Sequence, residues 1–348
     1  MEIRDADQSD NDALQALQSR CPQGSSLVVT TVNTPDFFAR IKAYPQYRVL
    51  VATDQARIVG STAVGIRPAW LGEQQSRVGY VCQVFVDPAV RRQGIAGALI
   101  SAAGEYLEDE SVPLAYTLIL DDNFASRRTF ERQGYRHHRG VSMRVLAVRG
   151  SVTIEPRGKV RSAQSDDLAA IAALLNETYR GCELAEPHSA ESLEQFFQRT
   201  PAMAVEDIRV LERDGAIVAC VGVQDWSGVT QITVESLGLR LRVLGWLLTT
   251  TRVLPRFVHP GEVLKQLTLI RIGFRSRADL AVLVRSINNE AYQRGFSQVC
   301  CISESSGTLL KSTRGLIGVD NTMQIYLKDV QAGGIVSDGP LYVDGVDL

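Results

Sequence analysis

Residues 84–97 read VFVDPAVRRQGIAG, so a short apolar run leads through a proline turn into a basic loop that contains glycine. The strand predicted here ends at Asp87 and Pro88, because proline cannot donate a backbone hydrogen bond to a sheet. A helix is expected to begin near Gly94, where the missing side chain lets the backbone approach a ligand closely. Free amides at a helix N-terminus favour an anion, and the arginines at 91 and 92 add donors that suit phosphate oxygens. The stretch therefore predicts a cradle for a diphosphate group.

Two common diphosphate motifs are absent from the chain. No GxxxxGK[ST] sequence occurs, and Gly94 and Gly97 do not form the GxGxxG fingerprint of dinucleotide-binding folds. What remains is the pattern R-x-x-G-x-A, at Arg91, Gly94 and Ala96. A second group of residues follows in DDNFASRRTFERQGY, residues 121–135, where a strand is expected to give way to a helix that a glycine ends.

Both motifs resemble those of the GNAT N-acetyltransferase superfamily, whose acetyl-CoA-binding motif is commonly written Q/R-x-x-G-x-G/A. GNAT domains commonly carry an asparagine after the fifth strand, a small residue three positions on, an aromatic residue seven on and Gly-aromatic eleven on. Here those positions hold Asn123, Ser126, Phe130, Gly134 and Tyr135. The resemblance covers residues 1–148. It covers the second half in element order only, as in tandem GNAT proteins of the mycothiol synthase type.

The resemblance implies acetyl-CoA as the co-substrate. The backbone of residues 84–86 would pair with the pantetheine, the amides of residues 92–97 would hold the pyrophosphate, and Asn123 would contact the cofactor beyond them. The expected cofactor-binding residues are Val84, Phe85, Val86, Arg91, Arg92, Gln93, Gly94, Ile95, Ala96, Gly97, Asn123 and Phe130.

The length and the element order both predict two domains. At 348 residues the chain exceeds the size at which one core usually keeps growing. The order strand, helix, helix, hairpin, strand, helix, strand occurs twice, with the second helix of the first copy expected over residues 35–44. We interpret this as a diverged tandem duplication. It predicts a catalytic GNAT domain at 1–149, a degenerate GNAT-like domain at 150–330 and a C-terminal tail at 331–348, either a loose closing strand or a flexible end.

The expected fold class is α/β (α+β), with tandem GNAT-like domains that are each a mixed, mostly antiparallel sheet flanked by helices. In the second copy the loop that matches the cradle reads GFRSRAD, residues 273–279. It lacks the cradle's glycines, and Asp279 at the helix start would repel a phosphate even though Arg275 and Arg277 are present. We expect this copy to have lost CoA binding and to wall the substrate cleft.

The acid and the base are less clearly marked. Acetyl transfer from a thioester to an amine needs a neutral amine, a stabilised oxyanion and a proton for the leaving thiolate. Many GNAT enzymes carry a tyrosine as the acid at the position of Phe130, and phenylalanine has no proton to give. Enzymes that acetylate protein N-termini often carry a glutamate where this chain has Leu118. The remaining candidates for proton transfer are Glu73, Tyr80 and Asp122, with Asp121 and Cys82 as alternatives.

Composition argues against several other classes of protein. A formal net charge of −2 and a pI near 6.1 argue against strong attraction to nucleic acid or to an anionic membrane. Six scattered cysteines and four histidines show no metal-ligand spacing, so no metal is expected. The N-terminal MEIRDADQSD has no apolar stretch of the kind found in signal peptides, and a cytoplasmic location is expected.

Residues 228–262 are interpreted as an insertion in the second copy. They contain LGLRLRVLGWLL, the longest apolar run, in which Arg240 and Arg242 argue against a membrane span. A helix packed on the second domain is the expected structure, and an interfacial amphipathic helix is the alternative.

Together these features predict acetyl-CoA-dependent N-acetylation of a small amine or amino-acid-like metabolite by direct attack in a ternary complex. The acceptor site would use loops such as GIRPAWLGEQQSR, residues 65–77. We expect no nucleic-acid or membrane partner, and a monomer or a homodimer. Two alternatives stay open. A non-catalytic acyl-CoA-binding sensor or scaffold is favoured by Phe130 and the missing acids, and a protein lysine acetyltransferase is the other.

Overall fold

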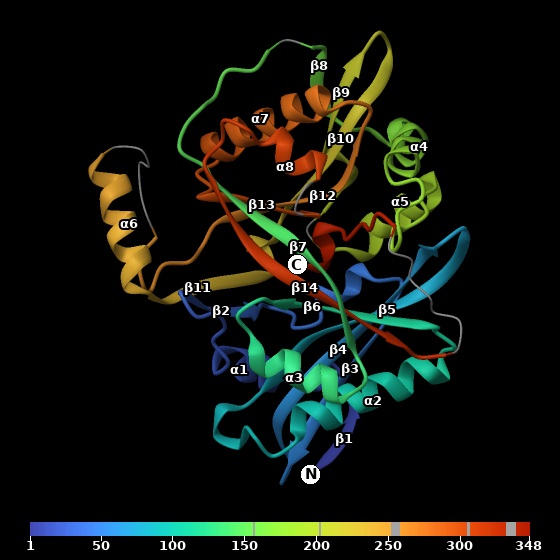
Figure 1. Ribbon diagram of the computed structural model, residues 1–348, viewed down its shortest axis with the longest axis vertical. Coiled ribbons are helices and arrows are strands. Elements are labelled where there is room, and N and C mark those ends of the chain that lie inside the picture. The colour runs from blue at the N-terminus through green and yellow to red at the C-terminus, as the bar shows by residue number, and fades with distance from the viewer. Residues whose placement is uncertain (156, 202, 252–257, 305–306, 332–338) are drawn as a thin grey trace.

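The computed structural model describes residues 1–348 except residues 156, 202, 252–257, 305–306 and 332–338. In this described part of the chain, one twelve-stranded sheet runs through the molecule and two further strands form a small separate sheet. Figure 1 shows the elements of the first half of the chain gathered around one end of the large sheet and those of the second half around the other. The mixed, mostly antiparallel sheet flanked by helices confirms the predicted fold class.

The first half of the chain contains seven of the strands. They are β1 (Glu2–Asp5), β2 (Leu27–Asn33), β3 (Gln46–Asp54), β4 (Arg57–Leu71), β5 (Gln74–Val86), β6 (Leu114–Leu120) and β7 (Arg136–Ala147). The helices are α1 (Asn11–Ser19), α2 (Ile95–Asp109) and α3 (Phe124–Arg132), with short 3-10 turns η1 (Gln8–Asp10), η2 (Ile41–Ala43) and η3 (Pro88–Val90). Gln55 and Ala56 join β3 to β4 with φ of 47° and 66°, the left-handed pair that a tight hairpin turn requires.

The second half largely repeats this order. Its strands are β8 (Lys159–Ser162), β9 (Ile208–Arg213), β10 (Ala216–Asp225), β11 (Thr230–Leu237), β12 (Gln266–Phe274), β13 (Gln298–Glu304) and β14 (Gly318–Asp329). Its helices are α4 (Leu168–Thr178), α5 (Ala190–Arg199), α6 (Leu239–Thr250), α7 (Arg277–Gln293) and α8 (Thr308–Ser312). The 3-10 turns are η4 (Ser165–Asp167), η5 (Val205–Asp207), η6 (Trp226–Gly228) and η7 (Gly345–Asp347).

An equivalent ion pair lies at the start of both halves. Arg4 makes two hydrogen bonds of 2.7 Å to Asp10, and Arg161 makes hydrogen bonds of 2.6 and 3.0 Å to Asp167. In each case the carboxylate also accepts a hydrogen bond from the backbone amide three residues earlier. The pair therefore ties the first strand of each half to the first turn of the helix that follows.

The two halves exchange their last strands. The strand order in the large sheet is β1-β3-β4-β5-β6-β14-β7-β13-β12-β10-β9-β8. Strand β14 pairs antiparallel with β6, and β7 pairs antiparallel with β13. The stretch GVSMRVLAV, residues 140–148, therefore lies on the far side of β14, next to the second half. Each half is completed by a strand of the other, and one continuous sheet results.

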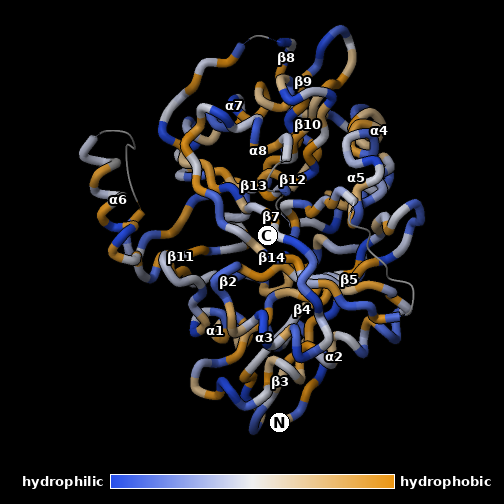
Figure 2. Tube along the Cα trace, viewed as in Figure 1, coloured by the Kyte–Doolittle hydropathy of each residue, from blue (hydrophilic) through white to orange (hydrophobic). Residues whose placement is uncertain are grey.

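The two faces of the sheet in the first half are covered differently. Helix α2 packs on one face, where Leu99, Ile100 and Leu107 are fully buried. On the other face, the C-terminal residues Leu341 and Val343 join the core. The described part of the tail, residues 339–348, is thus neither a closing strand nor a loose end. Figure 2 shows the apolar residues concentrated on the central strands of both halves.

The helix predicted over residues 35–44 is wrong. Only η2 forms there, and Phe37, Phe38 and Ile41 are all buried. Side chains bind the first amides of this segment and hold it in a turn. Asn11 Oδ1 accepts from the Phe37 amide at 2.8 Å, and Asp36 Oδ1 accepts from the Phe38 amide at 2.9 Å. Short polar side chains of this kind compete with helix formation.

The expected packing of the apolar insertion on the second domain is also wrong. Strand β11 pairs with β2 of the first half in the small sheet, and α6 carries several large apolar side chains in solvent. Figure 1 shows α6 standing away from the rest of the molecule. Among the described residues, no helix combines the length and apolar character needed to cross a membrane.

Candidate functional site

Strands β5 and β6 part in the middle of the sheet. Their parallel pairing covers only Val78↔Leu114 to Tyr80↔Tyr116, although β5 continues for six more residues. A bulge lies just beyond, where Gln83 takes a φ of 52° and the register with β4 shifts. Bulges bend a strand and end its pairing. Within the described chain, no strand pairs with β5 on its β6 side after Tyr80.

The predicted cradle comes soon after β5 in the sequence. Arg92 and Gly94 have φ of 67° and 83°, so the loop turns its successive amides toward one side before α2 begins at Ile95. Such alternation of backbone conformations makes an anion-binding concavity. For residues 92–97 the structure gives no hydrogen-bond acceptor to any backbone amide, and residues 91–94 are exposed. Unsatisfied amides and the helix dipole together favour a negatively charged ligand.

The start of the loop is held by Asp87. Its carboxylate accepts from the Ala89 amide at 3.0 Å, from Arg57 at 2.6 Å and from Arg20 at 3.0 Å. The Ala89 amide and the arginines keep the pKa of Asp87 below its usual value. Close packing holds the helix as well, since a Cβ on Gly60 would lie 2.9 Å from Ile95 Cγ2. Asp87 is therefore ionised and paired, which limits its repulsion of an anion at the cradle.

The second motif is placed beside this loop, with several of its members in structural roles. Asn123 is exposed and caps α3 by accepting from the Ser126 amide at 3.1 Å. Gly134 ends α3 with a φ of 86°. Phe130 is 2% exposed and packs edge to face on Tyr135, with ring centroids 5.0 Å apart. Phe130 thus belongs to the core under α2 and α3.

A cluster of hydroxyl groups surrounds Asp347 where β5 and β6 part. Tyr116 donates to Asp347 Oδ2 at 2.8 Å, Tyr44 donates to Oδ1, and Tyr80 donates to the backbone oxygen at 2.7 Å. Arg67 lies 3.7 Å from the same carboxylate and donates to the Tyr116 hydroxyl at 3.0 Å. We call these five residues the tyrosine–aspartate cluster. Tyr80 and Tyr116 are the last paired residues of β5 and β6, so the cluster lies at the point of separation.

Burial sets the ionisation of this cluster. It raises the pKa of Tyr80 and of Tyr116 well above the usual value, so both phenols remain protonated donors at neutral pH. Burial likewise raises the pKa of the Cys82 thiol to about 12, and the charge of Asp347 adds to this. It also raises the pKa of Asp347, against the opposing pull of Arg67 and the tyrosine hydroxyls. A carboxyl group with a raised pKa is better matched to proton transfer near neutral pH.

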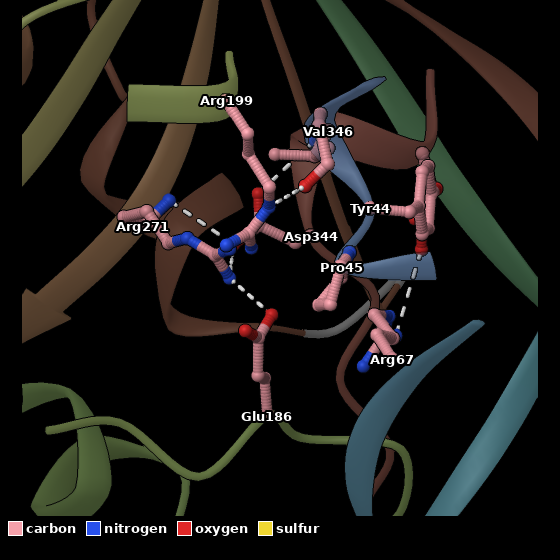
Figure 3. Close-up of a pocket in the computed structure, with 10 residues that line it drawn as sticks. Tyr44, Pro45, Arg67, Glu186, Arg199, Arg271, Asp344 and Val346 are labelled. Carbon is pink, nitrogen blue, oxygen red and sulfur yellow. Dashed lines mark hydrogen bonds and ion pairs between the residues drawn. The ribbon is translucent and has the colours of Figure 1, made fainter. Parts of the chain in front are cut away.

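A small polar pocket adjoins the cluster, as Figure 3 shows. Arg271, at a bulge of β12 with φ of 48°, donates to Glu186 at 2.8 Å and lies 3.6 Å from Asp344. Its Nε is buried without a partner in the structure. Arg199 donates from Nε to the Ala43 carbonyl at 2.8 Å. Both halves and the C-terminal residues therefore contribute side chains to this pocket.

The structure brings only one of the sequence-predicted proton carriers into the cluster. Tyr80 is part of it, whereas Glu73 is exposed at the tip of the β4–β5 hairpin. Asp122 is exposed at the end of β6, where it accepts a hydrogen bond from Ser25. Residues 65–77, expected as an acceptor loop, lie in β4, β5 and the turn between them.

Sequence reasoning missed most of the cluster. Tyr44, Arg67, Tyr116 and Asp347 lie far apart in the chain, and no local motif joins them. One signal was available, because Arg67 stands in an apolar run, and a buried charge requires a partner. The partner itself, from the last residues of the chain, could not be identified from spacing.

The matching region of the second half is built differently. Strands β12 and β13 also part after three residue pairs, Gln266↔Gln298 to Thr268↔Cys300. The helix that follows, α7, is capped by Ser276, whose hydroxyl accepts from the Asp279 amide at 3.2 Å. Asp279 in turn pairs with Arg213 at 2.8 Å. The first turn of α7 already has a side-chain partner and a buried carboxylate. Within the described residues, no cluster of His, Cys, Asp or Glu is placed to hold a metal ion.

Comparison with known proteins agrees with this geometry. Residues 12–135 match the family model described as the acetyltransferase (GNAT) family. No curated protein gives a match. Among solved structures, N-myristoyltransferase from Saccharomyces cerevisiae with bound myristoyl-CoA is similar, with 12% identity, a TM-score of 0.68 and coverage of 100% of this chain and 88% of that chain.

Bacterial proteins are similar as well. A GCN5-related N-acetyltransferase from Sphaerobacter thermophilus has 15% identity, a TM-score of 0.58 and coverage of 97% of both chains. Another from Anabaena variabilis has 12% identity, a TM-score of 0.54 and coverage of 96% of this chain and 74% of that chain. At such identities the likeness shows the fold, while the family match covers the half that carries the cradle. Residues 12–135 accordingly match the GNAT family, and the fold of the whole chain is similar to that of GNAT-type structures.

Proposed function

We propose that this protein is an acetyl-CoA-dependent N-acetyltransferase that acts on a small amine by direct transfer. One observation supports this most: the unpaired edge of β5 leads to the free amides of residues 92–97 at one end and to the tyrosine–aspartate cluster at the other. A thioester bound along this edge would present its carbonyl beside a buried carboxylate and two protonated phenols.

The cofactor is proposed to add to β5 as a strand would. Backbone groups of residues 84–86 take the pantetheine amides, and the cradle takes the pyrophosphate through its amides and the two exposed arginines at 91 and 92. Main-chain hydrogen bonds at a free strand edge are a common mode of recognition for extended ligands. Acetyl-CoA is the proposed donor, and myristoyl-CoA is the natural comparison because one similar structure holds it.

The proton from the amine is proposed to pass to Asp347. An acceptor ammonium gives one proton to this carboxylate, and the neutral nitrogen attacks the thioester carbonyl. The C–S bond then breaks, and the leaving CoA thiolate takes the second proton from the nitrogen. Tyr80 and Tyr116, held as donors, orient Asp347. General-base catalysis of this kind typically contributes about 10²- to 10⁴-fold to the rate.

The second half is proposed to hold the acceptor side in place without binding CoA. Arg271 fixes the C-terminal segment, since its backbone amide donates to Asp344 at 3.1 Å. That segment brings Asp347 to β5 and β6. In this account the degenerate copy supplies geometry, and the first copy supplies the cofactor site.

Measuring CoA release with acetyl-CoA or myristoyl-CoA tests the proposal. The acceptor panel is ethanolamine, glucosamine, free lysine and a lysine-containing peptide. We expect turnover of a small amine with acetyl-CoA, and a loss of at least about hundredfold in Asp347→Asn. Asp109→Asn, the same change at the exposed end of α2, is the control and should keep the wild-type rate. Binding of acetyl-CoA without turnover of any amine would contradict the enzyme and favour a sensor, and turnover of the peptide alone would point to protein lysine acetylation.

A further inference from the structure

Helix α6 exposes an apolar surface that the rest of the described chain does not cover. Leu239, Val243, Trp246 and Leu247 are 75%, 56%, 67% and 48% exposed. Their spacing of four, three and one residues places them on one face of a helix. We call these four residues the α6 apolar face. Figure 2 shows several strongly apolar positions along this isolated helix.

Positive charge accompanies this surface. From Leu239 to Gly261 the sequence contains four arginines, at 240, 242, 252 and 256, and no aspartate or glutamate. The whole chain has a net charge of −2, so this segment differs in sign from the rest of the protein. Arg240 and Arg242 are both exposed. Exposed tryptophan and aliphatic side chains next to arginines are the residue types that interfacial helices present to the headgroup region of a membrane, and α6 exposes both.

The helix is fixed to the body at both ends of the segment. Before α6, the Gly238 amide donates to the Ser26 carbonyl at 2.7 Å, and β11 pairs with β2 along its length. After it, the Gly261 amide donates to the Val234 carbonyl at 2.7 Å, and the Leu264 amide donates to Ile232 at 2.8 Å. Because α6 is anchored to the rest of the protein on both sides, binding at its apolar face would fix the orientation of the whole protein.

We propose that α6 docks this protein on the surface of a membrane that contains anionic phospholipids. The α6 apolar face enters the interface, and Arg240 and Arg242 pair with lipid phosphates. The proposal departs from the expectation that the protein has no membrane partner. It does not rest on the proposed catalytic activity.

A second copy of the chain fits this surface less well. A twofold-symmetric contact brings the same patch of each copy together. Arg240 and Arg242 of both copies would then approach one another, with no acidic residue between positions 239 and 261 to neutralise them. Anionic phospholipids supply that missing charge, each Lys or Arg near such a surface contributing about 1 kcal/mol.

Docking would bring the cofactor site close to the membrane. Ser26, which contacts the residue before α6, follows Ser25, and Ser25 donates to Asp122 next to Asn123. Two hydrogen bonds and two peptide links thus connect the residue before α6 to Asn123. The enzyme would meet its substrates at the membrane surface.

Vesicle binding by the full chain tests the proposal. The probes are vesicles of phosphatidylcholine alone and of equimolar phosphatidylcholine and phosphatidylglycerol, with co-sedimentation and tryptophan emission as readouts. We expect binding to the anionic vesicles only, with a blue shift of emission that Trp246→Ser abolishes, because Trp226 is buried and Trp70 is half-buried in β4. Arg240→Gln with Arg242→Gln should weaken binding roughly thirtyfold.

Matched control variants distinguish binding through α6 from nonspecific hydrophobic or electrostatic binding elsewhere on the protein. Tyr292→Ser removes an aromatic side chain that is 48% exposed on α7, and Arg180→Gln with Arg314→Gln removes two exposed arginines elsewhere. Both should bind as wild type does. The proposal fails if anionic vesicles are not bound, if these controls weaken binding as much as the α6 variants, or if α6 variants instead abolish a concentration-dependent dimer.

Discussion

Replacing Arg271 with methionine should cost about 3–5 kcal/mol of folding stability, the usual effect of removing one partner from a buried ion pair. Arg271 is 4% exposed in its side chain and Glu186 is 8% exposed, and their hydrogen bond is 2.8 Å long. Burial disfavours the charge on Glu186, yet Arg271 and His188 hold its pKa at about 2. Without the guanidinium, that charge stays buried near neutral pH and lacks its hydrogen-bonded partner. Asp344 keeps donors from Tyr342 and the Val346 amide, so Glu186 should account for most of the cost.

The assay is urea unfolding at neutral pH, with the free energy taken by linear extrapolation. Arg271→Met with Glu186→Gln should recover most of the loss, to within about 2 kcal/mol of wild type, because no uncompensated charge remains. Arg294→Met is the control. Its pairs with Glu290 and Asp225 are at the surface, with Arg294 42% exposed, and should contribute less than about 1 kcal/mol. If Arg271→Met is as stable as the control, or if the double variant is no more stable than Arg271→Met, the buried pair does not contribute the stability assigned to it.

Three further predictions address pH, the second half and the cradle helix. Burial lowers the pKa of His188 to about 4. The unfolded chain therefore takes up this proton first, so stability should fall by up to about 3 kcal/mol as pH drops from about 6.5 to 4, and His188→Asn should flatten that part of a urea-midpoint profile. Arg275→Ala with Arg277→Ala should leave the acetyl-CoA dissociation constant unchanged in calorimetry; a clear loss would mean that the second half binds CoA. Gly60→Val should cost about 1–3 kcal/mol and weaken acetyl-CoA binding, because its Cβ would lie 2.9 Å from Ile95 Cγ2, and unchanged unfolding and binding would count against the close packing of α2.

Local features of the first half could be predicted from sequence because each depends on nearby residues. The β3–β4 hairpin, strand β6 and helices α2 and α3 all lie where the apolar pattern and the turn residues indicate them. The cradle loop could be predicted for the same reason, because an apolar run, a proline and a glycine lie close together in the sequence there. The helix wrongly predicted at residues 35–44 shows where local sequence patterns stop being sufficient. The turn formed there is held partly by Asn11, which accepts from the Phe37 amide, and only the folded chain brings Asn11 to this position.

Long-range arrangements were not predictable in this way. The exchange of β7 and β14 depends on which strand edges meet in the folded chain. The sequence of either strand would be compatible with the place next to β6 or the place next to β13. Asp347 reaches Tyr44 and Tyr116 from more than two hundred residues away in sequence. Helix α6 was expected to pack on the second domain because apolar helices usually do. The pairing of β11 with β2, which no local sequence pattern indicates, directs the segment away from the second half.

The most direct test of the account is calorimetric titration of acetyl-CoA into wild type, Gly94→Ala and Gly94→Glu. A Cβ on Gly94 would meet no atom within 4 Å, so alanine adds only backbone strain at a φ of 83°, of about 1–2 kcal/mol. Glutamate adds the same strain and a negative charge where the pyrophosphate is proposed to bind. We predict one site per chain in wild type, retained binding in the alanine variant and none in the glutamate variant. Unchanged binding in Gly94→Glu, two sites per chain, or no binding by wild type would contradict the assignment of a single CoA site to the loop at residues 91–97.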